Sequence, residues 1–428
     1  MSRSGPRTRP HTASSADLAA VFPWQAGRPL LRQGTLVGRD VFGGGAFLYD
    51  TWMLYEHRII TSPNKLVMGQ LGSGKSSLGK TLVWRNRVFG RRAWVLDPSA
   101  NREWTGLAEA MGCPPIDFRA GTGVVMNALG HYAGDVSGEA TAAGRLEISR
   151  AVARWGVGRR LDPEEETVVQ VALQFAVDYA RREHREPTFL DLAQIVWRPS
   201  QDLAAAVGYD TGAELRDRSR AIAHGLRRVV TGEVGAMFSG QSTGGIDLDQ
   251  PLVCFQLGGV QQEVLGIVMT CIFAALRRVL RETDDNDPVR RSLYVDEAWW
   301  AFREEASLAF IQKLWKDCRK LGIDIWAFLH RLSDLAAVGD VGSQAHAIAM
   351  GLLADTDTRV IYRQSESETE NLERHLGMNA QGVDLIRVLR PGEALWQVGR
   401  AGQYVVQHIR TGAEREFSDT DKRMASVA

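Results

Sequence analysis

Short apolar runs separated by longer helical patterns recur along the chain from residue 66 onward. The runs are a few residues long and bounded by glycine, proline or charged residues, which is typical of buried strands. We expect strands at residues 66–68, 93–96, 252–257, 292–295, 323–329 and 359–362. Strands that alternate with helices form a parallel sheet covered by helices on both faces. The pattern therefore predicts an α/β fold with a parallel central sheet.

Two further strand patterns lie near the ends of the chain. Residues 394–398 and 404–409 are joined through a glycine-containing turn and predict a hairpin. Residues 35–55 are glycine-rich, with a probable turn at Gly43-Gly44-Gly45. We interpret this early region as a short N-terminal β extension of the sheet.

Between residues 134 and 232 the pattern becomes helical throughout. Asp162 precedes a proline and three glutamates, which is a strong helix start. Thr188 and Asp191 have the spacing of a capping box that opens a second helix, and a third helix is expected over residues 213–230. The sequence thus predicts an all-helical subdomain inserted between strands of the α/β domain.

These patterns divide the chain into five parts. The first residues are basic and rich in Ser, Thr and Pro, which is typical of a disordered tail. We expect a disordered tail at 1–20, the β extension at 21–60, the α/β domain at 61–133 and 233–415, the helical insertion at 134–232, and a C-terminal tail at 416–428.

A complete phosphate-binding motif, Gly-x-x-x-x-Gly-Lys-Ser, follows the first of these strands and precedes a helix. Its glycines let backbone N–H groups surround an anion, and the helix N-terminus adds partial positive charge. Lys75 is expected to reach the β- and γ-phosphates of ATP, and the Ser76 hydroxyl to coordinate Mg²⁺. The predicted nucleotide-binding residues are Gly69, Gln70, Leu71, Gly72, Ser73, Gly74, Lys75, Ser76 and Ser77.

An apolar strand at residues 292–295 ends in adjacent carboxylates, Asp296 and Glu297. At the carboxyl end of a parallel strand this pair would lie beside the phosphate loop. Asp296 is then a ligand of the Mg²⁺ water shell, and Glu297 is placed to polarise an attacking water. A solvated turn at a strand end is the simpler alternative.

The strand at residues 323–329 ends at His330, which makes this histidine a candidate sensor of the γ-phosphate. A satisfied core histidine is the alternative. Arg319 and Lys320 precede the same strand, at the end far from their own phosphate loop. They either serve the ATP of a neighbouring subunit across a ring interface or complement the helix dipole.

Composition limits the partners and the cellular compartment that the sequence predicts. Lysine and arginine number 51, as do aspartate and glutamate, so no global charge indicates a nucleic-acid or membrane partner. The four cysteines are scattered without metal-ligand spacing, as in a reduced cytoplasmic protein. The longest apolar run, residues 264–276, is shorter than the ~20 residues that span a bilayer, and favours a buried helix.

The order of several motifs resembles a known family. After the phosphate loop come Asp97-Pro98 leading to Glu103-Trp104, then Met237 to Thr243, the Asp296-Glu297-Ala298-Trp299 strand end, Arg319 to Gly322, and Gly392 to Leu395. Over residues 60–410 this order is similar to the ATPase domain of the type IV secretion and conjugation ATPases, within the HerA–FtsK superfamily of P-loop motors.

The resemblance implies a RecA-like core, assembly into a hexameric ring, and ATP hydrolysis that powers transfer of DNA or protein across an envelope. It also implies that Arg319 matches an arginine finger acting in trans, and that membrane channel proteins and DNA are candidate partners at the inner face of the membrane. This sequence departs from the family at His330, where glutamine is usual, and in the length of the region before the phosphate loop.

Two other functions stay open at this point. One is a HerA- or FtsK-like DNA translocase outside secretion, and the other is a slowly hydrolysing, nucleotide-gated assembly factor. A GTPase is disfavoured because no Asn-Lys-x-Asp motif follows the phosphate loop. A small P-loop kinase is disfavoured by the helical insertion together with the Asp-Glu strand end.

Overall fold

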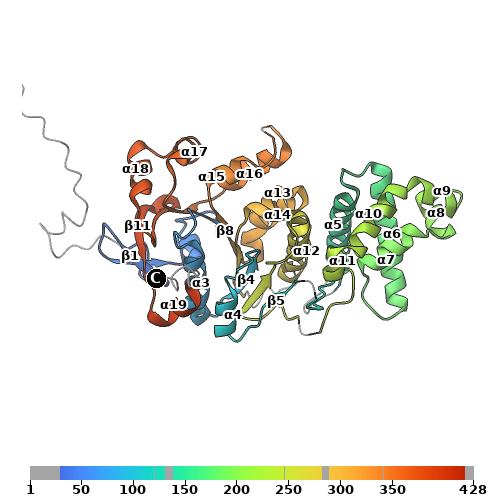
Figure 1. Ribbon diagram of the computed structural model, residues 1–428, viewed down its shortest axis with the longest axis horizontal. Helices are drawn as coiled ribbons and strands as arrows, with labels where there is room; N and C mark the ends of the chain where they lie inside the picture. The colour runs from blue at the N-terminus through green and yellow to red at the C-terminus, as the bar shows by residue number, and fades with distance from the viewer. Residues whose placement is uncertain are drawn as a thin grey trace, which may run out of the picture.

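The computed structural model describes residues 29–119, 121–130, 138–244, 246–281, 289–340 and 342–419. In these residues the strands form one eleven-stranded sheet. Its order is β2 (Ala46–Tyr49), β1 (Thr35–Asp40), β11 (Gly402–His408), β10 (Glu393–Val398), β9 (Thr358–Tyr362), β3 (Lys65–Met68), β8 (Ile323–Leu329), β7 (Arg291–Val295), β4 (Arg92–Asp97), β6 (Leu252–Gln256) and β5 (Ile116–Asp117). The molecule is elongated, with the antiparallel edge of the sheet at one end and a helical block at the other (Figure 1).

Seven neighbouring strands, from β9 through β3, β8, β7, β4 and β6 to β5, are parallel. They include all six strands that the sequence predicts for the central sheet. The prediction of an α/β fold with a parallel central sheet is therefore confirmed.

The remaining strands are antiparallel and join the two ends of the chain. The predicted hairpin is present as β10 and β11, and β1 of the N-terminal extension pairs with β2 on one side and with the distant β11 on the other. The pairing is close at Gly38, where a Cβ atom would lie 1.9 Å from the carbonyl oxygen of Gln407. Sequence patterns could identify these strands but not this long-range partner.

The expected turn at Gly43-Gly44-Gly45 connects β1 to β2, with Gly44 at φ +70°. A short helix that the sequence did not predict, α2 (Thr51–Glu56), follows β2. Its first turn is capped by Asp50, which accepts from the N–H groups of Trp52 and Met53.

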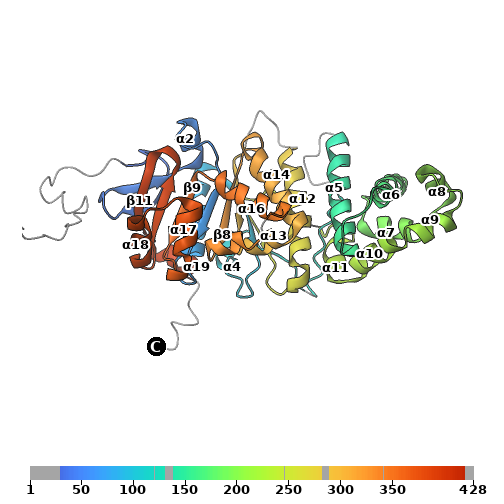
Figure 2. The same ribbon diagram turned by 90° about the horizontal axis from the view of Figure 1, so that it is seen from above.

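Side chains alternate along the parallel strands, so the sheet has two apolar faces. Leu66 and Met68 point to one face and Val67 to the other. The first face packs against α12 (Gln262–Arg281), α13 (Trp299–Arg303), α14 (Glu305–Leu321) and α16 (Gln344–Ala354). The second packs against α2, α3 (Lys75–Asn86), α4 (Thr105–Ala110) and α19 (Gly412–Ser418). Coverage of both faces is as predicted, and Figure 2 shows it from above.

The long apolar run at residues 264–276 is the buried centre of α12, as expected. Within the described ranges, no helix combines the length and the apolar character needed to cross a membrane. Three further helices belong to the described residues of the sheet domain. They are α15 (Leu332–Ala336) after β8, and α17 (Thr369–Leu376) and α18 (Ala380–Val388) between β9 and β10.

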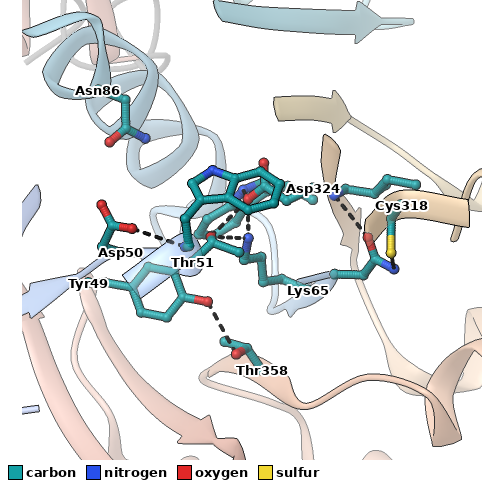
Figure 3. Close-up of polar contacts among 12 residues, drawn as sticks. Tyr49, Asp50, Thr51, Lys65, Asn86, Cys318, Asp324 and Thr358 are labelled. Atoms are coloured by element: carbon teal, nitrogen blue, oxygen red, sulfur yellow. Dashed lines mark hydrogen bonds and ion pairs between the residues drawn. The ribbon is translucent and has the colours of Figure 1, made fainter. Parts of the chain in front are cut away.

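A buried polar network fixes the N-terminal extension to the sheet (Figure 3). Lys65 on β3 forms an ion pair with Asp324 on β8 and bonds to the Thr51 hydroxyl at the start of α2. The side chains of Lys65 and Asp324 are 0% and 3% exposed. Burial lowers the pKa of Lys65 to about 8, although the charge of Asp324 opposes the shift. Removing one partner would leave the other charge buried and unpaired. Because Thr51 at the start of α2 bonds to this pair, the network holds α2 against β3 and β8.

The helical block lies between β5 and β6 in the chain. It consists of α5 (Gly138–Val157), α6 (Pro163–Arg182), α7 (Phe189–Trp197), α8 (Gln201–Val207), α9 (Gly212–Arg218), α10 (Arg220–Thr231) and α11 (Glu233–Phe238). Both predicted caps are present as capping boxes, at Asp162 with Glu165 and at Thr188 with Asp191.

The single helix expected over residues 213–230 is instead two helices, α9 and α10, interrupted at Ser219. The Ser219 hydroxyl donates to the carbonyl oxygen of Leu215 at 2.7 Å, four residues earlier. A serine that bonds back in this way often bends a helix. The prediction was wrong only at this break.

Two glycines let α5 and α10 approach each other closely. A Cβ atom at Gly156 would lie 2.6 Å from the carbonyl oxygen of Gly225, and one at Gly225 would lie 2.9 Å from the Gly156 carbonyl carbon. The block is joined to the sheet domain through α5, where Glu147 pairs with Arg277 of α12 at 2.9 Å.

The predicted tail at residues 1–20 lies outside the described residues, as does the C-terminal tail from residue 420 onward. Residues 416–419, placed in that tail by the sequence, belong largely to α19, which packs on α3 and α4.

We expect Gly156→Ala to lower the free energy of unfolding by about 1–3 kcal/mol, because the added methyl group meets backbone that cannot rotate away. The measurement is denaturant unfolding followed by circular dichroism. Gly351→Ala is the matched control, since Gly351 is also helical but a Cβ there meets no atom within 4 Å. That control should stabilise the protein by about 0.5–1 kcal/mol. Equal effects of the two substitutions would contradict the close helix contact.

Candidate functional site

The phosphate-binding motif forms the connection from β3 to α3, with Gly74 as the residue before the helix. Gly72 and Gly74 have φ of +72° and +107°, a region that favours glycine. A Cβ atom at Gly69 would lie 2.5 Å from Cβ of Tyr362, so the loop passes close to β9. The backbone conformation therefore favours glycine at positions 72 and 74, and the close approach to Tyr362 favours it at position 69.

Neighbouring strand ends hold this loop in place. The Gly69 N–H donates to the Leu329 carbonyl at 3.3 Å, and the Gln70 N–H to the Arg363 carbonyl at 3.2 Å. On the other side, the N–H of Gly392 donates to the Ser73 carbonyl at 3.0 Å. The loop is thus anchored to the segments after β8 and β9 and before β10.

Lys75 is the buried cation of the site, 8% exposed. Its Nζ donates to the carbonyl oxygens of Gly69 at 2.6 Å and Gln70 at 3.1 Å. Burial lowers the pKa of Lys75, while the carboxylates of Asp296 and Glu297 act in the opposite direction. The side chain therefore lies over the loop, on the side of the acidic pair.

Asp296 and Glu297 follow β7 and face the loop. Asp296 Oδ2 accepts from the indole N–H of Trp104 at 2.8 Å, and burial raises the pKa of this aspartate. Glu297 has φ +48°, which is rare for a residue other than glycine and costs of order 1–3 kcal/mol. A strained backbone at a strand end is typical of functional positions.

The Glu297 carboxylate is held by two donors from different elements. Its Oε2 accepts from Nε2 of His330, after β8, at 2.7 Å and from the indole N–H of Trp299, in α13, at 2.8 Å. Burial alone would raise the pKa of Glu297, but the hydrogen bonds from His330 and Trp299 and the charge of Lys75 bring it below its usual range. Glu297 is therefore kept as an ionised, oriented carboxylate.

His330 lies between the lysine and the glutamate. Its Nδ1 is 3.5 Å from Lys75 Nζ, while Nε2 contacts Glu297. With a proton on Nε2 for the carboxylate, Nδ1 is the acceptor for the ammonium group. The histidine thus links the phosphate-loop lysine to the acidic strand end.

Three further residues behind the loop were not proposed from the sequence as site residues. Burial, followed by the charge of Asp296, raises the pKa of Glu103, while the nearby Ser76 side chain acts in the opposite direction. Lys80 is fully buried; its Nζ has no hydrogen-bond partner among the described residues and lies 6.0 Å from the Trp104 ring. Asp97 accepts from the backbone N–H groups of Ser99 and Trp104.

A cavity of about 780 Å³ contains this chemistry at one end. Of the predicted nucleotide-binding residues, Leu71 through Ser77 line it, as do Asp296, Glu297 and His330. Gly69 and Gln70 are not among its lining residues, and their carbonyl oxygens accept from Lys75. The opposite wall comes from the end of β11 and from α19, through Gln407, His408, Arg410 and Arg415.

His408 in this wall is neutral at physiological pH. Burial, followed by the charges of Arg85 and Arg410, lowers its pKa to about 3. Its Nε2 lies 2.8 Å from the Thr81 hydroxyl on α3. No local sequence pattern predicts this wall, because it depends on pairing between distant strands.

Arg319 and Lys320 do not reach this cavity. Both are exposed at the end of α14, just before β8, while the phosphate loop lies at the other end of that strand, about 20 Å away for seven residues. Arg319 lines a separate cavity of about 370 Å³ together with Asp355 and Asp357. The structure therefore does not bring Arg319 to the site of its own chain.

Comparison with known proteins gives a match in structure but not in sequence. No protein-family model matches the chain, and no curated protein matches it significantly in sequence. VirB4 of Thermoanaerobacter pseudethanolicus superposes with a TM-score of 0.71 at 19% identity, over 91% of this chain and 100% of that chain. The bacterial conjugative coupling protein TrwBdeltaN70 gives 0.58 at 17% identity, over 93% and 92%.

The plasmid coupling protein TrwB in complex with ADP and Mg²⁺ gives a TM-score of 0.56 at 17% identity, over 83% of this chain and 87% of that one. These likenesses cover between 83% and 93% of this chain. The chain therefore shares the fold of VirB4 and TrwB, the RecA-like fold that the resemblance of its sequence motifs implies.

The buried carboxylates behind the loop give a testable pH dependence. Burial, followed by the charge of Asp296, raises the pKa of Asp97 to about 7. Between about pH 4 and pH 7 the unfolded chain loses this proton while the folded chain keeps it, so the free energy of unfolding should fall by a few kcal/mol as pH rises. Asp97→Asn should flatten that decline in denaturant unfolding at pH 5, 6 and 7. Glu109→Gln, at an exposed position, is the control. If the free energy of unfolding of Asp97→Asn fell with pH as steeply as that of the wild type, the result would contradict a proton held on buried Asp97.

Proposed function

We propose that this protein is an ATP-hydrolysing motor of a conjugative or type IV secretion system. One observation carries the proposal: at a single edge of the parallel sheet, Lys75 lies in a glycine loop opposite Glu297, and His330 contacts both at 3.5 and 2.7 Å. A buried cation beside an oriented carboxylate is what hydrolysis of a phosphoanhydride requires. The whole-chain likeness to VirB4 and TrwB supports this class of motor.

The cavity has the size and polarity of a nucleotide site. Its volume of about 780 Å³ lies within the range of small-molecule pockets. The Ser73 hydroxyl is buried without a hydrogen-bond partner in the described residues, as expected of a group that faces phosphate oxygens. Lys75 would exchange its two loop carbonyls for the β- and γ-phosphates of ATP.

The same residues fit magnesium. In the described residues no group of three or more His, Cys, Asp or Glu side chains could hold a metal alone. This agrees with Mg²⁺, which is held by one or two protein oxygens together with phosphates and water. Ser76 and Asp296 are the proposed ligands, and Glu103 lies near Ser76. When bound, Mg²⁺ neutralises charge on the phosphates.

Glu297 is the proposed general base. Both of its donors use Oε2, which leaves Oε1 to accept a proton from a water next to the γ-phosphate. Trp299 and His330 fix the direction of the carboxylate, and the low pKa of Glu297 keeps it ionised. His330 is the proposed sensor of the γ-phosphate. Its Nδ1 lies near Lys75 Nζ, so a phosphate that draws Lys75 away removes that contact.

Arg319 is proposed to act on the ATP of a neighbouring subunit. Its exposure at the edge opposite the phosphate loop supports contact with a second copy and therefore a ring, which we propose to be hexameric. In this proposal residues 134–232 form a domain separate from the ATPase core at 61–133 and 233–415, with the β extension at 21–60. The proposed location is the cytoplasmic face of the membrane, next to channel proteins.

Two substitutions test the proposed hydrolysis. We expect Glu297→Gln to lower kcat for ATP by about 10²–10⁴ while ATP still binds, because the water loses its base. Lys75→Ala should weaken binding of a fluorescent ATP analogue as well. Steady-state phosphate release and equilibrium binding are the measurements, with Glu370→Gln, an exposed helical glutamate, as the control. Wild-type turnover in the Glu297→Gln protein would exclude this mechanism. Tight binding with very slow wild-type turnover would favour the assembly factor.

Mixing experiments test the role of Arg319. Arg319→Ala and Lys75→Ala should each be inactive alone. Randomly mixed in equal amounts, they should recover about a quarter of wild-type activity, since about one interface in four then joins an intact Lys75 to an intact Arg319. Absence of recovery from subunits shown by light scattering to mix would place the finger elsewhere.

A further inference from the structure

The indole that bonds to Glu297 is itself held by side chains at the surface. Trp299 begins α13, a helix of five residues that starts without a side-chain cap. A helix of one turn has little stability of its own, so its geometry depends on contacts with its neighbours. Trp299 and Trp300 are both half-buried, and their rings stack with centroids 3.9 Å apart and planes at 29°.

Arg303 covers this aromatic pair. It follows Trp299 by four residues and Trp300 by three, and helical spacing places such positions on one face. Its guanidinium carbon lies 4.6 Å from the centroid of the Trp299 ring and 5.6 Å from that of the Trp300 ring. Arg303 is exposed and makes no ion pair with a described residue. Cation–π attraction to the two indoles is therefore what orders this side chain.

The position of Trp299 in turn determines the direction of the carboxylate. Glu297 Oε2 accepts from the Trp299 indole N–H at 2.8 Å and from His330 at 2.7 Å. If the indole turns away, one donor remains, and the carboxylate can rotate because the terminal torsion of glutamate is broad. Oε1 is then no longer fixed toward the attacking water.

We propose that Arg303 is a positioning residue for ATP hydrolysis, which acts through Trp299 on the Glu297 carboxylate. Arg303, Trp299 and Trp300 are not among the residues that line the cavity of about 780 Å³, so none of them is proposed to touch ATP. The inference rests on the proposed role of Glu297 as the base. It adds a control point on the surface of α13, because a contact that pulls Arg303 off the indoles would slow hydrolysis without entering the ATP site.

Steady-state phosphate release by the full chain tests the effect on catalysis. Arg303→Ala should lower kcat about two- to fivefold with KM for ATP unchanged, as expected for loss of one exposed cation–π contact. Trp299→Phe keeps an aromatic ring but loses the N–H donor, and should lower kcat about tenfold. The double variant should be no slower than Trp299→Phe, because the link from Arg303 to the carboxylate is already broken. Arg303→Lys keeps the cation and should retain about half of the wild-type kcat or more.

Nuclear magnetic resonance of the indole N–H groups tests the contact without hydrolysis. In a chain isotope-labelled on tryptophan, the Trp299 signal is the one missing from Trp299→Phe. Arg303→Ala should move this signal towards the position of a solvent-bonded indole, because the hydrogen bond to Glu297 weakens.

The matched control is Arg227→Ala, and circular dichroism checks the folding of each variant. Arg227 is also exposed and lies 4.5 Å from the Trp197 ring, but it belongs to α10 of the helical block. This control removes the same kind of contact and should change neither kcat nor the Trp299 signal.

An unmoved Trp299 signal in Arg303→Ala would overturn the role of Arg303, as would an equal fall of kcat in Arg227→Ala. A moved signal with wild-type kcat, in a protein that Glu297→Gln inactivates, would also overturn it. Wild-type turnover in Glu297→Gln is a different result, because it overturns the proposed base itself.

Discussion

The hydrogen-bonded register of three parallel strands determines where the chemistry of this protein lies. Met68 of β3 is paired with Leu329 of β8, and Val295 of β7 is paired with Ala327. Beyond Val295, the Ala298 N–H donates to the Phe328 carbonyl, and Glu297 thus lies beside the end of β8 and contacts His330. A slip of one residue would turn alternate side chains to the other face of the sheet. Segments more than 200 residues apart in the chain meet only because this register is maintained.

The same strands are fixed again near their amino ends by the ion pair between Lys65 and Asp324. Lys65 is paired with Trp326 in the β3–β8 register, and its ammonium group lies 4.6 Å from that indole ring. A buried ion pair contributes little net stability compared with apolar residues, but it disfavours arrangements that leave either charge alone. We infer that this pair specifies the register of β3 and β8 more than it stabilises the fold. Thr51 bonds to both charged groups and thereby ties the N-terminal extension to the same register.

Local patterns were sufficient to predict the elements that depend on neighbouring residues. The phosphate motif, the apolar strands and the capping boxes at Asp162 and Thr188 are properties of a few consecutive side chains. Patterns could not predict that β1 pairs with β11, because no short-range signal encodes a partner several hundred residues away. The roles of Trp299 and Trp104 were missed for the same reason. Each indole N–H finds its carboxylate only after the strands have assembled.

The strain at Glu297 shows why these later contacts matter. A left-handed backbone disfavours this residue by of order 1–3 kcal/mol, and glycine would remove that cost. Glycine would also remove the carboxylate, so the position keeps both the strain and the function. The conformation is held by its neighbours: the Ala298 N–H donates to the Phe328 carbonyl at 2.8 Å, and the side chain is bonded by His330 and Trp299. Since His330 directly follows β8 and Trp299 begins α13, the glutamate can adopt its orientation only while both elements are docked beside β7. The order of the carboxylate is therefore a property of the assembled sheet edge rather than of the Asp-Glu sequence alone.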